Sequence, residues 1–520
     1  MAGFPLTGVD PNDPIPGIVR EIRFQQGTAA GANNARPVVL LGNKVAAGLE
    51  PDDTLGDPIA DQQDMIDRAG YRSELLLMYR AAVAVDPDAT YYMIAVPEGV
   101  GATAASCTLT VGSAPGAAAL AVTVAQVSLL GEVIEVTVQS GDTPAIVAAN
   151  LAAAITNQIF WPVTASVGSG AAANALTVLC ANKGPRGGYV LRTLRAKLAR
   201  SVGVSIIKSA VTPGTVDDDH TNALAQLDSA EIYYQISAKT TLGDGSAGNA
   251  VISPTDSGIG EHAEFIKAQS LPNVGKAGVA IFGLCGTSAQ AATVGLAVNN
   301  VRVVLFHAKN PEWTPAMIAA HYGAAKRAKE IAHPGANLRW YGLKGADVSQ
   351  LPDPYLKADR LSRTEQRLDL NNGVTPIAHT SVGRAHIVRQ ITAACQTNGN
   401  YDYRARSGHI PSCTDYFWDA VKASYAAQMQ DFVAPDPPKG QKPLANVQYP
   451  SALKAIVNTE IDRAIDFTGG PYLDPSELDA MKAATQVVVI SNGLSVRATP
   501  VAVQHNNKGQ FLLLESSEPN

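Results

Sequence analysis

The chain has 520 residues, of which 46% are hydrophobic and 17% are charged. An average soluble protein has about 25% charged residues, so this composition excludes intrinsic disorder and predicts roughly three to four packed domains. The chain has 40 Lys and Arg residues against 46 Asp and Glu residues, a net charge of −6, which argues against binding to a nucleic-acid backbone.

The five cysteines are few, odd in number and widely spaced, without a C-x-x-C pair. This pattern excludes a disulfide framework or a zinc ribbon and indicates reduced thiols, as in the cytosol. The chain starts with acids and prolines where a signal peptide has a basic patch and an apolar run. Its most apolar stretch, residues 116–131, is too short and too polar to span a bilayer. We therefore expect a soluble protein that does not insert into membranes.

Residues 1–30 are predicted to form an extended N-terminal arm, because its closely spaced prolines disfavour a helix. The segment I-V-R-E-I-R-F-Q-Q alternates, with Ile18, Ile22 and Phe24 on one face and Val19 on the other, as in a short strand. This strand either forms the edge of the next sheet of its own chain or pairs outside its own fold.

An α/β domain is predicted to begin in residues 31–100. Strand patterns at 37–42 and 91–96 enclose helical material at 59–85. The composition then changes, since no Lys or Arg occurs from residue 81 to residue 182.

Residues 101–200 are predicted to be an inserted, β-rich surface domain. Alternating segments such as V-I-E-V-T-V indicate half-buried strands, and Thr143 followed by Pro144 marks the start of one helix. Six basic residues occur without an acid from Lys183 to Arg200. We interpret this run as a solvated domain junction or as a surface that forms salt bridges with a partner.

Residues 201–360 are predicted to complete the α/β domain. Helical patterns at 220–227, 259–271, 288–298 and 315–331 alternate with strand patterns at 230–236, 277–282 and 301–306. The strands are nearly continuous in apolar residues, as in V-R-V-V-L-F, which indicates a doubly wound, mostly parallel sheet covered on both faces.

The alternation ends near residue 361, and residues 361–495 are predicted to form an α+β C-terminal assembly domain. Paired strands at 373–379 and 386–391 precede a long helix at 414–432, a proline-rich linker at 434–443 and two further helices. Strands are expected at 486–490, 500–504 and 510–515, the last two within a C-terminal arm at 496–520. The exposed F-L-L-L-E segment would favour aggregation unless another strand pairs with it.

The chain offers no convincing catalytic, cofactor or metal site. The G-L-C-G-T-S turn at 283–288 lacks a nucleotide fingerprint and is interpreted as a tight strand-to-helix turn. His386, Cys395, His409 and Cys413 match no zinc spacing. His379 and Ser381 lack the sequence context of a nucleophile elbow. The run from Asp217 to His220 is interpreted as acids at a helix start.

The stretch N-N-G-V-T-P-I-A-H-T-S-V-G-R-A-H-I-V-R-Q-I-T, residues 371–392, resembles the tail sheath proteins of contractile-tailed bacteriophages, especially the Mu-like group. Asp415 and Tyr416, which open a long helix, and the low-charge insertion are similar to features of the same family. Ala393 departs from the family pattern, and the first 30 and last 25 residues match by character only.

The patterns and the resemblance together predict the fold class: a doubly wound α/β core domain with an inserted β-rich domain, an α+β C-terminal domain and extended terminal arms. The α/β part resembles the domain that the family calls subtilisin-like, a name for its shape only. The resemblance implies that the arms add strands to the sheet of neighbouring subunits. The predicted arm residues are Ile18, Val19, Ile22, Phe24, Val501, Val503, Phe511, Leu512, Leu513 and Leu514, and the predicted receiving residues are Val374, Ile377, Ile387, Val388 and Ile391.

The resemblance further implies a structural protein of the virion that is not an enzyme. It would be assembled in the host cytoplasm as hexameric rings stacked in a helix round the tail tube, and contraction would drive the tube through the host envelope. Its partners would be further copies of itself, the tail tube protein, and the baseplate and tail terminator proteins, with no nucleic acid and no cofactor. Two alternatives stay open: an α/β nucleotide-binding protein or enzyme, and the sheath of a phage-derived bacteriocin or injection device.

Overall fold

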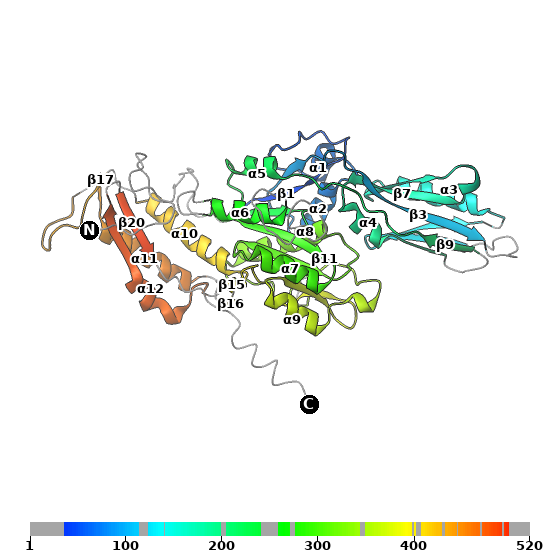
Figure 1. The fold of residues 1–520 in the computed structure, drawn as a ribbon. Helices are drawn as coiled ribbons and strands as arrows, with labels where there is room; N and C mark the ends of the chain where they lie inside the picture. Colours follow the sequence, from blue (N-terminus) through cyan, green and yellow to red (C-terminus); the bar gives the residue numbers. More distant parts are fainter. Residues whose placement is uncertain are drawn as a thin grey trace, which may run out of the picture.

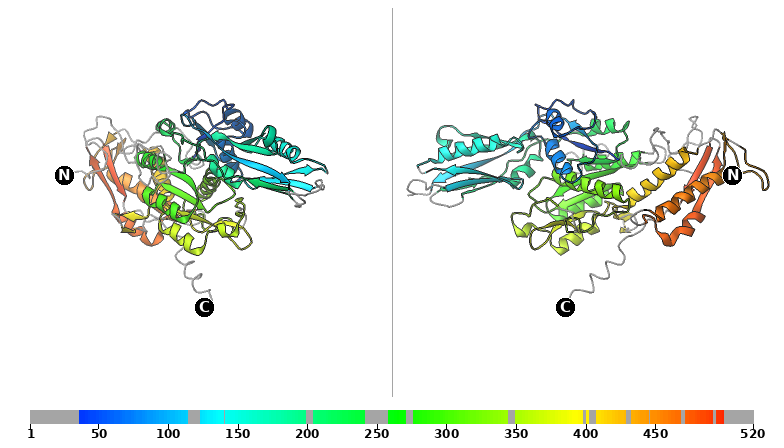
Figure 2. Two further views of the ribbon diagram at one scale, coloured as in Figure 1. Left: turned by 45° about the vertical axis from the view of Figure 1, so that its right-hand side comes forward. Right: turned by 180° about the vertical axis from the view of Figure 1, so that it is seen from behind.

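The computed structural model describes most of the chain between residues 36 and 498. The described ranges are 36–113, 123–139, 141–198, 204–240, 258–270, 276–343, 349–397, 400–401, 407–428, 432–444, 446–467, 471–490 and 493–498. All residues predicted to act in the two arms lie outside these ranges. The described parts lie in a row, with the insertion at one end, a central α/β part and a helical C-terminal part at the other end (Figures 1 and 2).

A seven-stranded sheet forms the central part. Its strands are β1 (Val38–Asn43), β2 (Tyr91–Val96), β10 (Tyr234–Ser237), β11 (Val279–Cys285), β12 (Val303–Ala308), β13 (Thr375–His379) and β14 (Ala385–Ile387). The spatial order is β14-β13-β12-β11-β10-β1-β2, and only β14 runs antiparallel to its neighbour. The order reverses between β1 and β10, which makes the carboxyl ends of these two strands the switch point of the sheet.

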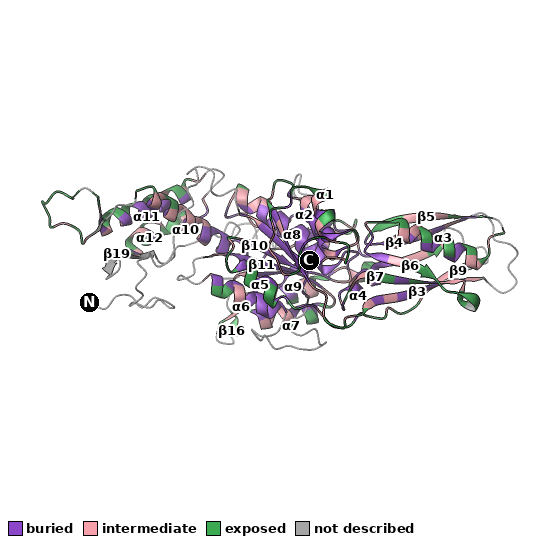
Figure 3. Ribbon diagram, turned by 90° about the horizontal axis from the view of Figure 1, so that it is seen from above, coloured by how far each residue is buried: buried purple, intermediate pink, exposed green. Residues whose placement is uncertain are grey.

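Helices cover both faces of this sheet, as the nearly continuous apolar strands predict (Figure 3). Val38 and Leu40 point into a core shared with α1 (Gln62–Ala69), α2 (Glu74–Val83) and α8 (Pro315–Ala332). Val39 and Leu41 point to the other face, where they pack against α5 (Thr221–Leu227). Further along that face, β11 and β12 pack against α6 (Ile259–Gln269) and α7 (Ser288–Val298).

Local signals set the helix boundaries in this part. The Thr314 hydroxyl accepts a hydrogen bond from the Met317 amide at 3.3 Å, and Pro315 occupies the first turn of α8. Thr287 and Gln290 form a reciprocal capping box at the start of α7. The G-L-C-G-T-S segment therefore ends β11 and caps α7.

The described residues of the insertion form two antiparallel sheets, two α-helices and one short 3-10 helix, Gly170–Ala172. Its elements are β3 (Ala104–Ser113), β4 (Thr123–Leu129), β5 (Glu132–Val138), α3 (Pro144–Asn157), β6 (Val163–Val167), β7 (Ala175–Lys183), α4 (Gly187–Thr193), β8 (Arg195–Leu198) and β9 (Val204–Lys208). The sheets have the orders β6-β7-β3-β9 and β5-β4-β8. Because β9 pairs with β3, the insertion's sheet continues past the predicted limit at residue 200.

The C-terminal part packs around its own apolar core. Its helices are α10 (Ile410–Ala426), α11 (Pro450–Ile465) and α12 (Leu478–Ala484), and α12 leads into the hairpin of β19 (Thr485–Ile490) and β20 (Gly493–Ala498). Phe417 and Val457 are fully buried in this core. The paired strands predicted at 373–391 belong instead to the central sheet, as β13 and β14, so that sheet crosses the predicted boundary at residue 361.

The remaining described elements are short and lie in or near the same parts. Helix α9 (Arg363–Asn371) precedes β13, and the two-residue pairs are β15 (Gln396–Thr397) with β16 (Asn400–Tyr401) and β17 (Phe432–Val433) with β18 (Val447–Gln448).

Candidate assembly edges and buried charged junctions

Four of the five residues predicted to receive a visiting strand are buried in the core of their own chain. Val374, Ile377, Ile387 and Ile391 are at most 1% exposed, and Val388 is half-buried. Val374 packs in the cluster that contains α6 and α7, whereas Ile377 and Ile387 belong to the cluster on the opposite side of the sheet. The structure therefore assigns these side chains to internal packing.

The backbone edge of β14 is occupied at Ile387. The Trp340 amide donates to the Ile387 carbonyl at 2.8 Å, and the Ile387 amide donates to the Tyr341 carbonyl at 3.0 Å. The Trp340 ring also stacks on His386, with ring centroids 5.8 Å apart. A second chain could add a strand at Ile387 only by displacing this segment, and the wider receiving edge stays a prediction.

A different strand edge is present at the far end of the molecule. Strands β19 and β20 pair over six residues each, and within the described residues their sheet has no third strand. Val487 of β19 packs against a small cluster formed by Tyr425 of α10 and by Leu453 and Ile456 of α11. The hairpin is therefore supported on one side by helices, and no described strand pairs with either of its outer edges.

A buried charged junction lies at the opposite end of the central sheet, at the carboxyl end of β1 and β10. At its centre is Arg186, which comes from the insertion just before α4 and is 8% exposed. Its Nε donates to Glu74 Oε1 at 3.0 Å, and its Nη1 donates to Asp217 Oδ1 at 2.8 Å. Its Nη2 donates to Asn43 Oδ1 at 2.6 Å. Every nitrogen of this guanidinium is thus used inside the protein.

The Asp218 carboxylate binds the insertion to the α/β part from the other side. It accepts from Arg186 Nη1 at 2.6 Å and Nη2 at 2.8 Å, from Asn43 Nδ2 at 3.0 Å and from Lys239 Nζ at 2.9 Å. Burial raises the pKa of Asp218, but Arg186, His220 and Lys239 outweigh it and hold the pKa well below its ordinary value. The carboxylate is therefore ionised and fully paired.

Burial has the larger effect on Glu74, the α2 partner of Arg186. It raises the pKa of this carboxyl, although Arg186 acts in the opposite direction. For Arg186 the balance is reversed. Burial lowers its pKa, but Asp218, Glu74 and Asp217 together hold the value well above its usual range.

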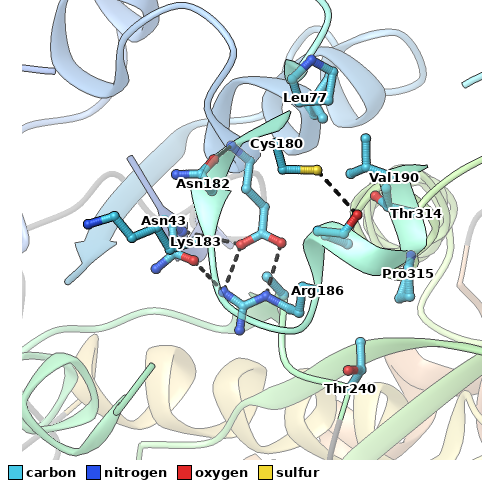
Figure 4. Close-up of a pocket in the computed structure, with 15 residues that line it drawn as sticks. Asn43, Leu77, Cys180, Asn182, Lys183, Arg186, Val190, Thr240, Thr314 and Pro315 are labelled. Atoms are coloured by element: carbon cyan, nitrogen blue, oxygen red, sulfur yellow. Dashed lines mark hydrogen bonds and ion pairs between the residues drawn. The ribbon is translucent and has the colours of Figure 1, made fainter. Parts of the chain in front are cut away.

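Figure 4 shows the small hollow beside this junction. Arg186 and Asn43 form one side of it, and Thr314 and Pro315 at the start of α8 form another. Glu74 also lines the hollow. Cys180 also lines it and donates from its thiol to the Gly187 carbonyl at 3.3 Å. Since the Arg186 nitrogens already have hydrogen-bond partners, we interpret the hollow as part of the contact between the insertion and the α/β part rather than as a ligand site.

Other members of the basic run contact the α/β part in the same way. Lys183 pairs with Glu98 at 3.2 Å, Arg192 donates to Asn310 at 2.8 Å, and Arg195 donates to Glu312 at 2.8 Å. The basic run therefore forms a domain junction, which is one of the two interpretations made from the sequence. Arg186, however, is buried, whereas that interpretation expected a solvated junction. The acids at 217–219 are only partly explained by the helix start, since Asp219 alone binds the Thr221 amide, at 2.9 Å.

A second charged junction binds the C-terminal part to the amino end of the sheet. Asp415 of α10 is fully buried and accepts from the Tyr233 hydroxyl at 2.8 Å and from Arg302 Nη2 at 2.9 Å. Tyr233 precedes β10 and Arg302 precedes β12, so this helix is held at the end opposite to Arg186. Burial raises the pKa of Asp415, but Arg302 outweighs it and lowers the value below its ordinary range.

The residues considered as zinc ligands are divided between β14, a loop and the start of α10. His386 is in β14, Cys413 is in the core of the C-terminal part, and His409 Nδ1 lies 2.9 Å from the Ser407 hydroxyl. Within the described ranges, no three His, Cys, Asp or Glu residues are grouped to hold a metal ion. Among the helices that the structure describes, none is long and apolar enough to cross a membrane.

The predicted turn at 283–288 uses its groups for packing. A Cβ at Gly283 would lie 1.9 Å from the Pro315 carbonyl oxygen, so only glycine allows β11 and the start of α8 to approach this closely. The Thr287 hydroxyl accepts from the Gln290 amide at 3.3 Å, which satisfies a donor that a phosphate site would need.

No model of a known protein family matches this sequence, and no curated protein matches it. Solved structures similar to the chain include the sheath tail protein of Desulfitobacterium hafniense, with 12% identity over 89% of this chain and 92% of that one and a TM-score of 0.45. The sheath tail protein of Listeria innocua has 12% identity over 92% and 95% of the two chains and a TM-score of 0.46. A chain of the anti-feeding prophage baseplate has 13% identity over 56% and 72%, with a TM-score of 0.31. All three TM-scores lie below 0.5, so the function proposed below depends on the residues of this chain.

Proposed function

We propose that this chain is a structural subunit that polymerises into the contractile sheath of a phage tail or of a related injection device. The observation that carries the proposal is the β19–β20 hairpin, a helix-supported pair of strands with outer edges at one end of the molecule. Such edges are templates for strands of other chains. The arm sequences at 18–26 and 510–515 have the alternating or apolar character of such strands.

In this proposal each arm pairs with the hairpin of a neighbouring copy. Each backbone hydrogen bond contributes about 1 kcal/mol net, so a strand of several residues forms a joint that survives while rigid parts rotate. Repeated head-to-tail contacts that do not close generate rings stacked as a helical tube. Contraction would then be a rigid-body change between two packings of the same subunits round a tube protein, ended by baseplate and terminator proteins.

The proposed receiving edge differs from the one predicted from sequence, because the β14 edge is occupied by residues 340–341. The resemblance at 371–392 supports the same proposal, although its strands β13 and β14 belong to the central sheet rather than to the C-terminal part. No described arrangement favours the enzyme or nucleotide-binding alternative over a structural role.

The test compares two truncations of the full chain. Removing residues 1–15 deletes the proline-rich start and keeps the strand segment, so we expect tubes or rings in electron micrographs, as from the intact chain. Removing residues 1–26 also deletes Ile18, Ile22 and Phe24, so we expect folded monomers by sedimentation and circular dichroism, without tubes. Normal tubes from the longer truncation would refute the proposal.

A further inference from the structure

Two fully buried histidines lie next to Asp218, the carboxylate that binds Arg186. His220 precedes α5, and His262 lies on α6. His220 Nδ1 and His262 Nε2 are 3.1 Å apart, and His220 Nε2 is 3.1 Å from Asp218 Oδ2. The pair therefore connects α6, through His220, to the carboxylate that holds Arg186.

The contacts determine where the protons sit when both rings are neutral. Because Asp218 is an ionised acceptor, His220 Nε2 carries a proton and its Nδ1 is an acceptor. His262 Nε2 must then donate to His220 Nδ1, which leaves His262 Nδ1 without a proton. In the described structure this buried nitrogen has no hydrogen-bond partner.

The surroundings of the pair supply both signs of charge. Asp218, Lys239 and Arg186 act on His220, and His220, Lys239 and Asp218 act on His262. The edge of the Phe282 ring of β11 packs against His262, with centroids 5.3 Å apart, and the Ser237 hydroxyl lies 3.4 Å from its Nε2. Water therefore has no direct access to either ring.

An added proton does not fit this arrangement. A proton on His220 Nδ1 would face the N–H of His262, so His262 would have to move its own proton to Nδ1, where no acceptor is present. A second proton would place two cationic rings in contact in the interior. Both rings can gain protons only if they reach water, and separation of the 217–220 segment from α6 breaks the contact between the two rings and exposes them.

We propose that the His220–His262 pair makes the junction between the insertion and the α/β part sensitive to acid, so that protonation releases Asp218 from Arg186. Asp218 is two residues from His220 on the same segment, so the movement that hydrates the ring also removes the carboxylate. This inference does not depend on polymerisation, because every contact lies within one chain.

The direction of the pH dependence follows from burial. Burial lowers the pKa of both histidines below 6.5, the ordinary value, although Asp218 acts against this at His220. The opened state therefore binds more protons than the closed state below that pH, and the closed state loses stability as the pH falls. A group with an ordinary pKa when opened and a much lower one when closed changes the opening equilibrium about fivefold between pH 6.5 and 5.5.

The test is hydrogen exchange of the full chain at pH 7.5, 6.5 and 5.5, corrected for intrinsic rates. We expect opening in peptides that cover 183–193 and 215–227 to increase over the last pH unit, by up to about fivefold for each histidine. His262→Gln should remove the contribution of one histidine to this increase. The double variant, His220→Gln with His262→Gln, should show no increase, because glutamine does not gain a proton. His321→Gln is the control, since His321 is buried beside α2, where its Nδ1 lies 3.3 Å from the Ala81 carbonyl, away from the junction.

Two results would overturn the proposal: junction peptides with no pH dependence in the unaltered chain, or an undiminished dependence in the double variant. If the double variant does not fold, NMR titration of labelled histidines in the unaltered chain decides instead. Two rings that titrate near pH 6.5 while the junction peptides stay protected would show that protonation does not open it.

Discussion

Glu74, Asp217 and Asp218 surround Arg186 in a region from which water is almost excluded. Removing charges from water is costly, and the cost is offset here because each guanidinium nitrogen donates to a carboxylate. The buried negative charges are compensated only while the Arg186 guanidinium is present. Replacing it would leave the carboxylates buried together, with Lys239 as the remaining cation of the cluster.

We therefore expect Arg186→Met to lower the free energy of unfolding by about 3–5 kcal/mol, the cost of a buried charge left without its partner. The measurement is urea denaturation followed by circular dichroism and tryptophan fluorescence. Lys183→Met is the matched control from the same basic run. The Lys183 side chain is 53% exposed and its partner Glu98 is 24% exposed, so losing this pair should cost at most about 1 kcal/mol. Equal losses for the two variants would contradict the buried role of Arg186.

The sequence shows the charges of this junction but not their grouping. Arg186 lies in a run of basic residues that is typical of a solvated face, and its partners come from positions 43, 74, 217 and 218. The acids at 217–219 have the position of helix-start acids, and Asp219 does act so. Asp218 follows the insertion in the sequence, and it meets Arg186 because the chain returns from the insertion beside the end of β1. This contact depends on the fold and has no local sequence signal.

At the scale of elements, β11 and the start of α8 lie very close together at Gly283. Among the described glycines, an added Cβ would come nearest to another atom here. The obstructing atoms at Gly283 belong to the Pro315 backbone, which cannot rotate away as a side chain could. The strand is central in the sheet and α8 is buried along most of its length, so neither element can move easily.

We expect Gly283→Ala to lower the thermal unfolding midpoint and to cost about 3 kcal/mol, as overpacking in a dense core does. Gly188→Ala is the control in α4, where an added Cβ meets no atom within 4 Å. There alanine should be neutral or stabilise by up to about 1 kcal/mol, because it favours the helix over glycine. A harmless Gly283→Ala variant would mean that β11 and α8 separate readily.

Elements with strong local signals could be predicted, and elements defined by distant partners could not. Helix α7 spans Ser288–Val298, as its capping residues and apolar spacing predict. Strands β8 and β9 were not predicted, since they are short and lie next to the basic run. Strand β9 is stabilised by β3, about a hundred residues earlier, whose sequence offers no local hint of this pairing.

The same limit applies to the predicted edge at β13 and β14. Their pairing with each other could be predicted from the alternation, and the structure has Ile377 opposite Ile387. Their union with β12, and the cover supplied by residues 340–341, depend on tertiary contacts. A strand pattern thus indicates that an edge exists but not whether it is open.

At the scale of the molecule, the two charged junctions bind the outer parts at opposite ends of one sheet. The insertion is held at the carboxyl end by Arg186, and α10 is held at the amino end by Asp415. The chain enters and leaves the insertion at neighbouring points, since the Thr103 and Thr215 hydroxyls lie 2.9 Å apart. Insertions whose ends lie this close can be removed with little strain on the host.

We therefore expect a chain in which a two-residue Asn-Gly turn replaces residues 104–214 to fold, with Thr103 and Thr215 still paired. The excision removes Arg186 and also the insertion that covers its partners, so Glu74 and Asp217 become hydrated instead of staying buried without a cation. The opposing cost is the exposure of apolar groups such as Leu77 and Ala316 beside the hollow. The apolar cluster runs from the insertion into the α/β part, so the excised chain should lose some unfolding free energy but still unfold cooperatively in the same denaturation. An excised chain that unfolds or aggregates would show that the insertion is part of the host's core.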